Sequence, residues 1–105
     1  MRHIKGEMSL MGQYILVEFK IFLNRVYINS NNPMVRSNFI KFMENQAAEA
    51  MKKNGEDAMP IKQSNNSTWV EITLPYPEEE ASEQIIVDKM KDDLEKANMK
   101  VTIIK

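Results

Sequence analysis

The stretch QYILVEFKIFL, residues 13–23, decides the fold class. Its apolar residues alternate with a second set that includes Glu18 and Lys20, which is the period-two pattern of a half-buried strand. β-branched and aromatic residues dominate the stretch, and these also favour a strand. A helix is the alternative, because several large apolar residues here also recur at helical spacing. We expect a strand, which residues 26–28 either prolong or join by folding back across Asn24.

A helix is expected over residues 33–53. Asn32 can accept hydrogen bonds from the free N–H groups of the first turn, and Pro33 suits the first helical position because it has no N–H. Gly55 is a natural terminator just beyond the last turn. Apolar residues recur along one face of this segment, and the predicted core residues from it are Val35, Phe39 and Phe42.

The rest of the chain alternates between strand and helix patterns. Residues 59–63 fit a short edge strand, 64–67 a turn, and 68–74 an alternating strand. A second helix over 79–97 begins with a run of glutamates, the favourable charge at that end, and 101–104 closes the chain as a strand. The predicted core residues of these elements are Val70, Ile72, Ile86, Met90 and Leu94.

These elements predict an α+β fold in two layers. We interpret residues 1–12, which show no period, as a loosely ordered leader, and residues 13–105 as a single domain. The order β-α-β-β-α-β indicates a ferredoxin-like arrangement, with two helices on one face of an antiparallel sheet. If residues 59–63 form no strand, the sheet has three strands plus any contribution from residues 26–28.

Composition limits the chemistry that the chain can carry. The 105 residues include no cysteine, which excludes disulfides and thiolate sites, and three glycines that form no phosphate-binding loop. The single histidine, His3, lies in the predicted leader, and the acids show no spacing typical of a calcium loop. We therefore predict no catalytic, cofactor-binding or metal-binding residues. A weak anion site is conceivable at the start of the first helix, at Asn32 and Arg36.

Charge is segregated although the net charge is only −1. Residues 78–98 carry a balance of −5, and the rest of the chain carries +4. This pattern predicts an acidic helix face that can steer toward a protein partner with a basic surface. A solvated face with i,i+4 ion pairs is the simpler interpretation. The acids expected to point outward are Glu79, Glu83, Asp93 and Glu95.

The sheet face without helices is a second candidate surface. Alternation places Tyr14, Phe22 and Trp69 on it, and such aromatics favour contact with a second copy of the chain or with another protein. Recognition of single-stranded nucleic acid would also use exposed aromatics. However, the accompanying Glu18 and Glu71 have the wrong charge for that role, so we do not expect a nucleic-acid partner.

The function class that fits best is a small non-catalytic interaction protein, such as an adaptor, a regulator or a phage-type inhibitor. The alternatives are a small dimeric enzyme or ligand-binding domain with a pocket between sheets, and a module that binds single-stranded nucleic acid. The charged first residues lack the apolar run of a signal peptide, and no stretch is apolar enough to span a membrane, so we expect a cytoplasmic location. Eleven Ile, eleven Lys and ten Asn indicate an AT-rich coding sequence, as in a low-GC bacterium or its phages.

Overall fold

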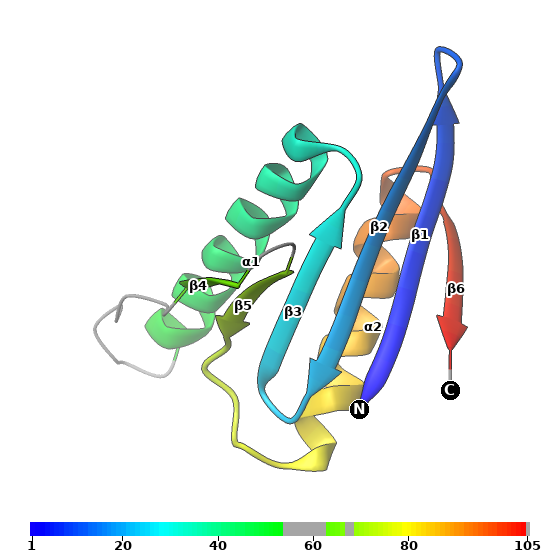
Figure 1. The fold of residues 1–105 in the computed structure, drawn as a ribbon. Coiled ribbons are helices and arrows are strands. Elements are labelled where there is room, and N and C mark those ends of the chain that lie inside the picture. The colour runs from blue at the N-terminus through cyan, green and yellow to red at the C-terminus, as the bar shows by residue number, and fades with distance from the viewer. Residues whose placement is uncertain (54–62, 67–68, 105) are drawn as a thin grey trace.

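The computed structural model describes residues 1–53, 63–66 and 69–104. Six strands and two helices make up this part of the chain, in the order β1-β2-β3-α1-β4-β5-α2-β6 (Figure 1). The predicted α+β class, with two helices and an antiparallel sheet, is confirmed. The bounds of the elements are β1 Arg2–Leu10, β2 Gln13–Phe22, β3 Arg25–Ser30, α1 Pro33–Lys53, β4 Gln63–Asn66, β5 Trp69–Thr73, α2 Glu80–Lys96 and β6 Lys100–Ile104.

All neighbouring strands in the sheet are antiparallel, in the order β4-β5-β3-β2-β1-β6. The first three strands form a meander, and β6 returns at the end of the chain to pair with β1. The predicted ferredoxin-like order is not confirmed, because three strands precede α1 where the sequence pattern predicted one. The segment after residue 23 folds back on β2 rather than prolonging it, and Leu23 adopts a positive φ of 56° in the turn.

The prediction of a loosely ordered leader over residues 1–12 is wrong. Most of this segment is β1, which lies inside the sheet between β2 and β6. Ile4 and Gly6 are buried on the helix side. A Cβ atom at Gly6 would lie 2.6 Å from Cδ2 of Leu94, so the missing side chain lets α2 approach β1 closely. Glycine at a buried position interrupts the apolar alternation, which explains why the pattern did not indicate a strand.

The edge of the sheet also differs from prediction. Residues 59–62 of the predicted edge strand lie outside the described residues, and β4 begins at Gln63. Residues 64–66, predicted as part of a turn, are strand and pair with β5. Short polar strands at an edge carry no apolar alternation, so turn-forming residue types dominated the interpretation.

Both helices form where the sequence predicts them. Oδ1 of Asn32 accepts the N–H groups of Met34 at 3.0 Å and Val35 at 3.1 Å, which is the predicted cap of α1. The second helix ends before Asn98, whose positive φ of 62° fits a residue type that tolerates the left-handed region.

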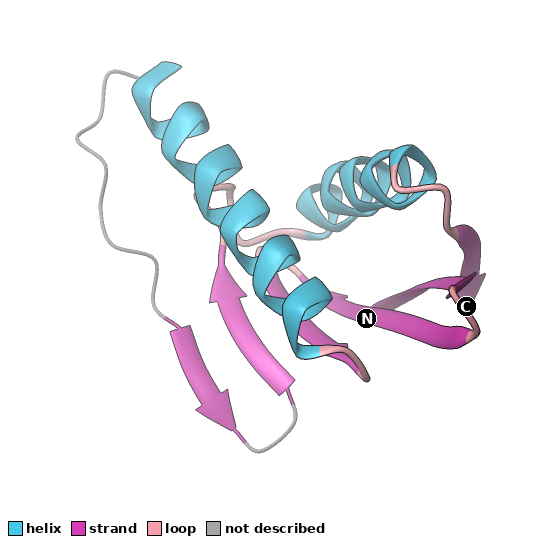
Figure 2. Ribbon diagram, turned by 90° about the horizontal axis from the view of Figure 1, so that it is seen from above, coloured by secondary structure: helices cyan, strands magenta, loops and turns pink. Residues whose placement is uncertain are grey.

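The core lies between the sheet and the helices, which both cover the same face (Figure 2). Five of the eight predicted core residues are buried: Val70, Ile72, Ile86, Met90 and Leu94. Val35 and Phe39 are partly buried and pack against the core, but Phe42 is 38% exposed, so its prediction is wrong. The reason is that α1 packs mainly on β3, whereas α2 packs on β1, β2 and β6. Phe42 faces the space between the two helices.

Candidate interaction site

An apolar groove of about 440 Å³ lies between the two helices. It is open to solvent, and β1, α1 and the end of α2 with the residues after it contribute to its lining. We call it the inter-helix groove. Its apolar lining residues are Met8, Val35, Phe39, Phe42, Ala97 and Met99.

The groove exists because the helices diverge over the sheet. Figure 2 shows α1 and α2 running in different directions above the strands. The ring of Phe39 packs edge-on against Phe19 with centroids 5.5 Å apart, which fixes α1 to the sheet. One turn further along the same face, Met43 is fully buried while Phe42 is left at the groove. The apolar face of α1 is therefore wider than the part that the sheet covers.

Asp93 is the single acid among the residues that line the groove. Its Oδ2 atom is shielded from solvent and has no hydrogen-bond partner in the part of the chain that the structure describes. Burial raises the pKa of Asp93 from 3.8 to about 6, with a further contribution from the neighbouring Asp92. Lys96 and Lys89 oppose this shift. However, Lys96 pairs with Asp92 at 3.0 Å, and Lys89 donates to the hydroxyl of Tyr76. The nearby cations are thus held by other groups.

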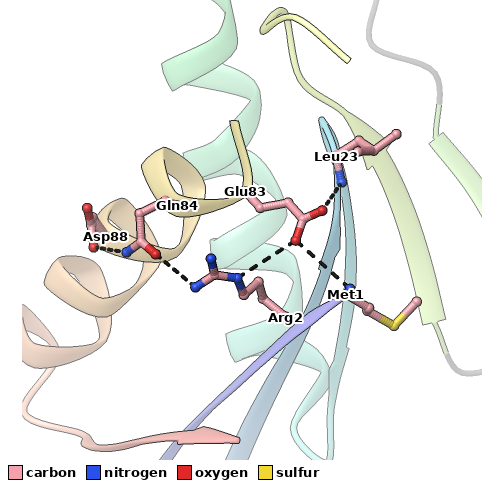
Figure 3. Close-up of polar contacts among 6 residues, drawn as sticks. All are labelled: Met1, Arg2, Leu23, Glu83, Gln84 and Asp88. Atoms are coloured by element: carbon pink, nitrogen blue, oxygen red, sulfur yellow. Dashed lines mark hydrogen bonds and ion pairs between the residues drawn. The ribbon is translucent and has the colours of Figure 1, made fainter. Parts of the chain in front are cut away.

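Glu83, predicted to point outward, is buried with 6% of its surface exposed, so that prediction is wrong. Its Oε2 accepts the N–H of Leu23 at 3.0 Å, and its Oε1 lies 3.8 Å from Nε of Arg2 and 4.0 Å from the amino group of Met1 (Figure 3). Arg2 also donates to Gln84, which donates to Asp88. Glu83 therefore ties α2 to the β2–β3 turn and the start of β1.

The other acids of the predicted face have different surroundings. Glu79 and Glu95 are exposed as expected, whereas Asp93 is half-buried at the groove. Glu95 pairs with Lys91 at 3.9 Å, an i,i+4 contact like that of Asp92 with Lys96. These pairs partly neutralise the solvent face of α2. The four predicted acids therefore differ in their surroundings: Glu83 makes buried contacts to Leu23 and Arg2, Asp93 lines the groove, and the other two are exposed.

The open face of the sheet does not bring the three predicted aromatic residues together. Tyr14 and Phe22 are 54% and 40% exposed but lie near opposite ends of β2. Trp69 is half-buried, and Nζ of Lys20 lies 4.5 Å from its ring centroid. Glu18 on the same face lies 3.7 Å from Nε2 of His3. Charges of both signs thus separate the aromatics, and self-association through this face stays a prediction.

The anion site at Asn32 and Arg36 stays a prediction. The side-chain oxygen of Asn32 already caps α1. Arg36 is half-buried, and its Nε atom has no hydrogen-bond partner.

Sequence reasoning missed the groove, although one signal was present. Asp93 follows Met90 by three positions and Ile86 by seven, which places it on the apolar side of the helix. An acid on the apolar side of a helix indicates a carboxylate that is at least partly buried.

Comparison with known proteins gives no further guide, since no family model, curated protein or solved structure matches the chain. Within residues 1–53, 63–66 and 69–104, no three acidic or histidine side chains gather as metal ligands. No helix in the described part of the chain has the length and apolar character needed to cross a bilayer.

Proposed function

We propose that this chain is a non-catalytic protein-interaction module that accepts the apolar face of a partner's amphipathic helix in the inter-helix groove. The observation that supports this proposal is the open apolar groove between α1 and α2, with Phe42 exposed along its wall. An adaptor, a regulator or an inhibitor of another protein would use such a surface.

A helix suits this groove better than a small molecule does. Small-molecule sites bury about 70–90% of their ligand in a concave pocket, whereas this groove is partly open to solvent. Val35, Phe39 and Phe42 recur at i, i+4 and i+7, so they form a ridge along α1. A third helix can lay its own i, i+3, i+4 and i+7 side chains beside this ridge, as in helix-in-groove recognition.

The acidic surface of α2 assists the same interaction. Glu95 is exposed on the helix that forms one wall, and Glu79 is exposed just before that helix begins. Exposed charges act chiefly on the rate of encounter, and their effect declines as salt rises. A partner with basic residues beside its apolar face fits this surface. Enzymatic or nucleic-acid functions have no comparable feature to support them among the described residues.

The test is binding of a designed neutral helix. A peptide of roughly 16 residues, long enough to populate a helix, carries Leu at i, i+3, i+4 and i+7 with Ala and Gln elsewhere. We expect it to bind, and Phe42→Ala to weaken binding about tenfold, because truncating a central aromatic contact typically costs this much. Calorimetry or fluorescence anisotropy measures both.

Two controls make the result specific. Met34→Ala removes a residue that is 72% exposed on the same helix but outside the groove lining, and should leave binding unchanged. A scrambled peptide, with its leucines spread around the helix, should bind at least tenfold more weakly. Absence of binding, or equal loss in the Phe42 and Met34 variants, would contradict the proposal.

A further inference from the structure

Asp93 is an acid whose charge is only partly compensated by the described residues, since Lys96 and Lys89 lower its pKa less than burial and Asp92 raise it. Asp93 lines an otherwise mostly apolar groove, and its Oδ2 atom has neither solvent nor a hydrogen-bond donor within residues 1–53, 63–66 and 69–104. Buried polar groups in proteins are nearly always hydrogen-bonded, so each exception calls for an explanation. We infer that the helix bound in the groove carries a lysine or arginine that pairs with Asp93. This inference rests on the proposed function and adds the chemistry of the partner.

Three features of the position disfavour a carboxylate. Asp93 lies in the last turn of α2, where the helix dipole is negative. Its sequence neighbour Asp92 is a second acid, and burial adds to the effect, so the pKa of Asp93 rises to about 6. A cation supplied from outside would offset these effects, because a nearby opposite charge favours the carboxylate.

The two described lysines that act on Asp93 each make a closer contact with another group. Lys96 also lines the groove, but its ammonium lies 3.0 Å from Oδ2 of Asp92. Lys89 donates to Tyr76. The groove residues from β1 and α1 are Met8, Val35, Asn38, Phe39 and Phe42, none of which titrates. The open side of the groove is therefore where a cation can reach Asp93.

Glu83 on the same helix provides the contrast. It is more deeply buried than Asp93, but it accepts the Leu23 N–H and faces Arg2, so its carboxylate has a structural role. Oδ2 of Asp93 has no such contact among the described residues. A carboxylate with an unpartnered buried oxygen, at the surface where a partner docks, fits recognition.

The test compares two peptides that differ at one position. In the neutral amphipathic peptide, one position flanking the leucine stripe is changed to Lys in one version and to norleucine in the other. We expect the Lys peptide to bind the wild-type chain about tenfold more tightly, as a partly desolvated charge pair can provide. In Asp93→Asn this preference should disappear, while affinity for the norleucine peptide stays the same. Placing the Lys at successive flanking positions in a small series ensures that one reaches Asp93.

Glu95→Gln is the matched control, because it removes one exposed acid from the same helix outside the groove lining. It should retain the preference for Lys. NMR titration of the Asp93 carboxyl group gives a second readout, and its pKa should fall below about 6 only in the complex with the Lys peptide. A preference for Lys that survives Asp93→Asn, or no preference at any position, would overturn the inference. The proposed function would still hold if the norleucine peptide bound in a way that Phe42→Ala weakens and Met34→Ala does not, and it would fail if neither peptide bound.

Discussion

Replacing the buried Glu83 with Ala tests how α2 is attached to the sheet. The substitution leaves the N–H of Leu23 without its acceptor, and an unsatisfied buried donor costs about 1–3 kcal/mol. Loss of the partly exposed Arg2 contact adds less than about 1 kcal/mol, since solvent screens such pairs. We therefore expect Glu83→Ala to lower the free energy of unfolding by about 1–4 kcal/mol. Glu83→Gln keeps an acceptor for Leu23 and should lose only about 1 kcal/mol.

Urea denaturation followed by circular dichroism measures these losses, provided that the slope with urea is the same for all variants. The control is Glu95→Ala, which removes an exposed acid paired with Lys91 and should change stability by less than about 0.5 kcal/mol. If Glu83→Ala lowered the free energy of unfolding no more than this control does, Glu83 would not attach α2 to the β2–β3 turn, and the reasoning would be refuted.

Four further predictions concern packing, capping, pH and assembly. Gly6→Ala should lower the free energy of unfolding by about 1–3 kcal/mol in urea melts, because the new Cβ meets Leu94; an unchanged midpoint would contradict the close approach. Asn32→Ala should cost about 1 kcal/mol by removing the cap of α1, and no loss of helicity or stability would argue against it. Because the pKa of folded Asp93 is about 6 against 3.8 in its ordinary state, the folded chain binds the extra proton between these values, so stability falls as pH rises through about 6. After discounting for solvent screening, the stability lost in this way is on the order of 1 kcal/mol. Asp93→Asn should abolish this loss, so the melting temperature should depend less on pH between about pH 4 and 7. Sedimentation at tens of micromolar tests association through the open sheet face: a dimer that Tyr14→Ser dissociates would support it, and a 12.2 kDa monomer would exclude a stable one.

The sequence predicted those elements best that are determined by interactions between residues close together in the chain. Asn32 and Pro33 fix the start of α1 by capping and by the missing N–H, and both act over a single turn. The alternation in residues 13–23 also lies within a single element, and it predicted β2 correctly. The sequence pattern did not indicate β1, because Gly6 occupies a buried position in that strand. A glycine is needed there because Leu94, which is distant in sequence, packs against it.

The candidate site was less predictable, because the directions of the helices create it. The periodicity of α1 does not reveal that this helix packs mainly on β3, so Phe42 was expected in the core but faces the groove. Glu83 is different, since it precedes Val87 by four positions and Met90 by seven. That spacing places Glu83 on the buried side of α2. It was nevertheless expected to point outward, because glutamate is rarely buried.

The location of the bound peptide tests the central claim most directly, and the methionines of the chain report on it. Met8 and Met99 line the groove, whereas Met11 and Met34 are 96% and 72% exposed and lie outside its lining. With methyl-labelled methionine, titration of the neutral amphipathic peptide should shift the NMR signals of Met8 and Met99 and leave those of Met11 and Met34 in place. Shifts confined to Met11 and Met34, or no shifts at saturating peptide, would contradict a helix-binding groove between α1 and α2.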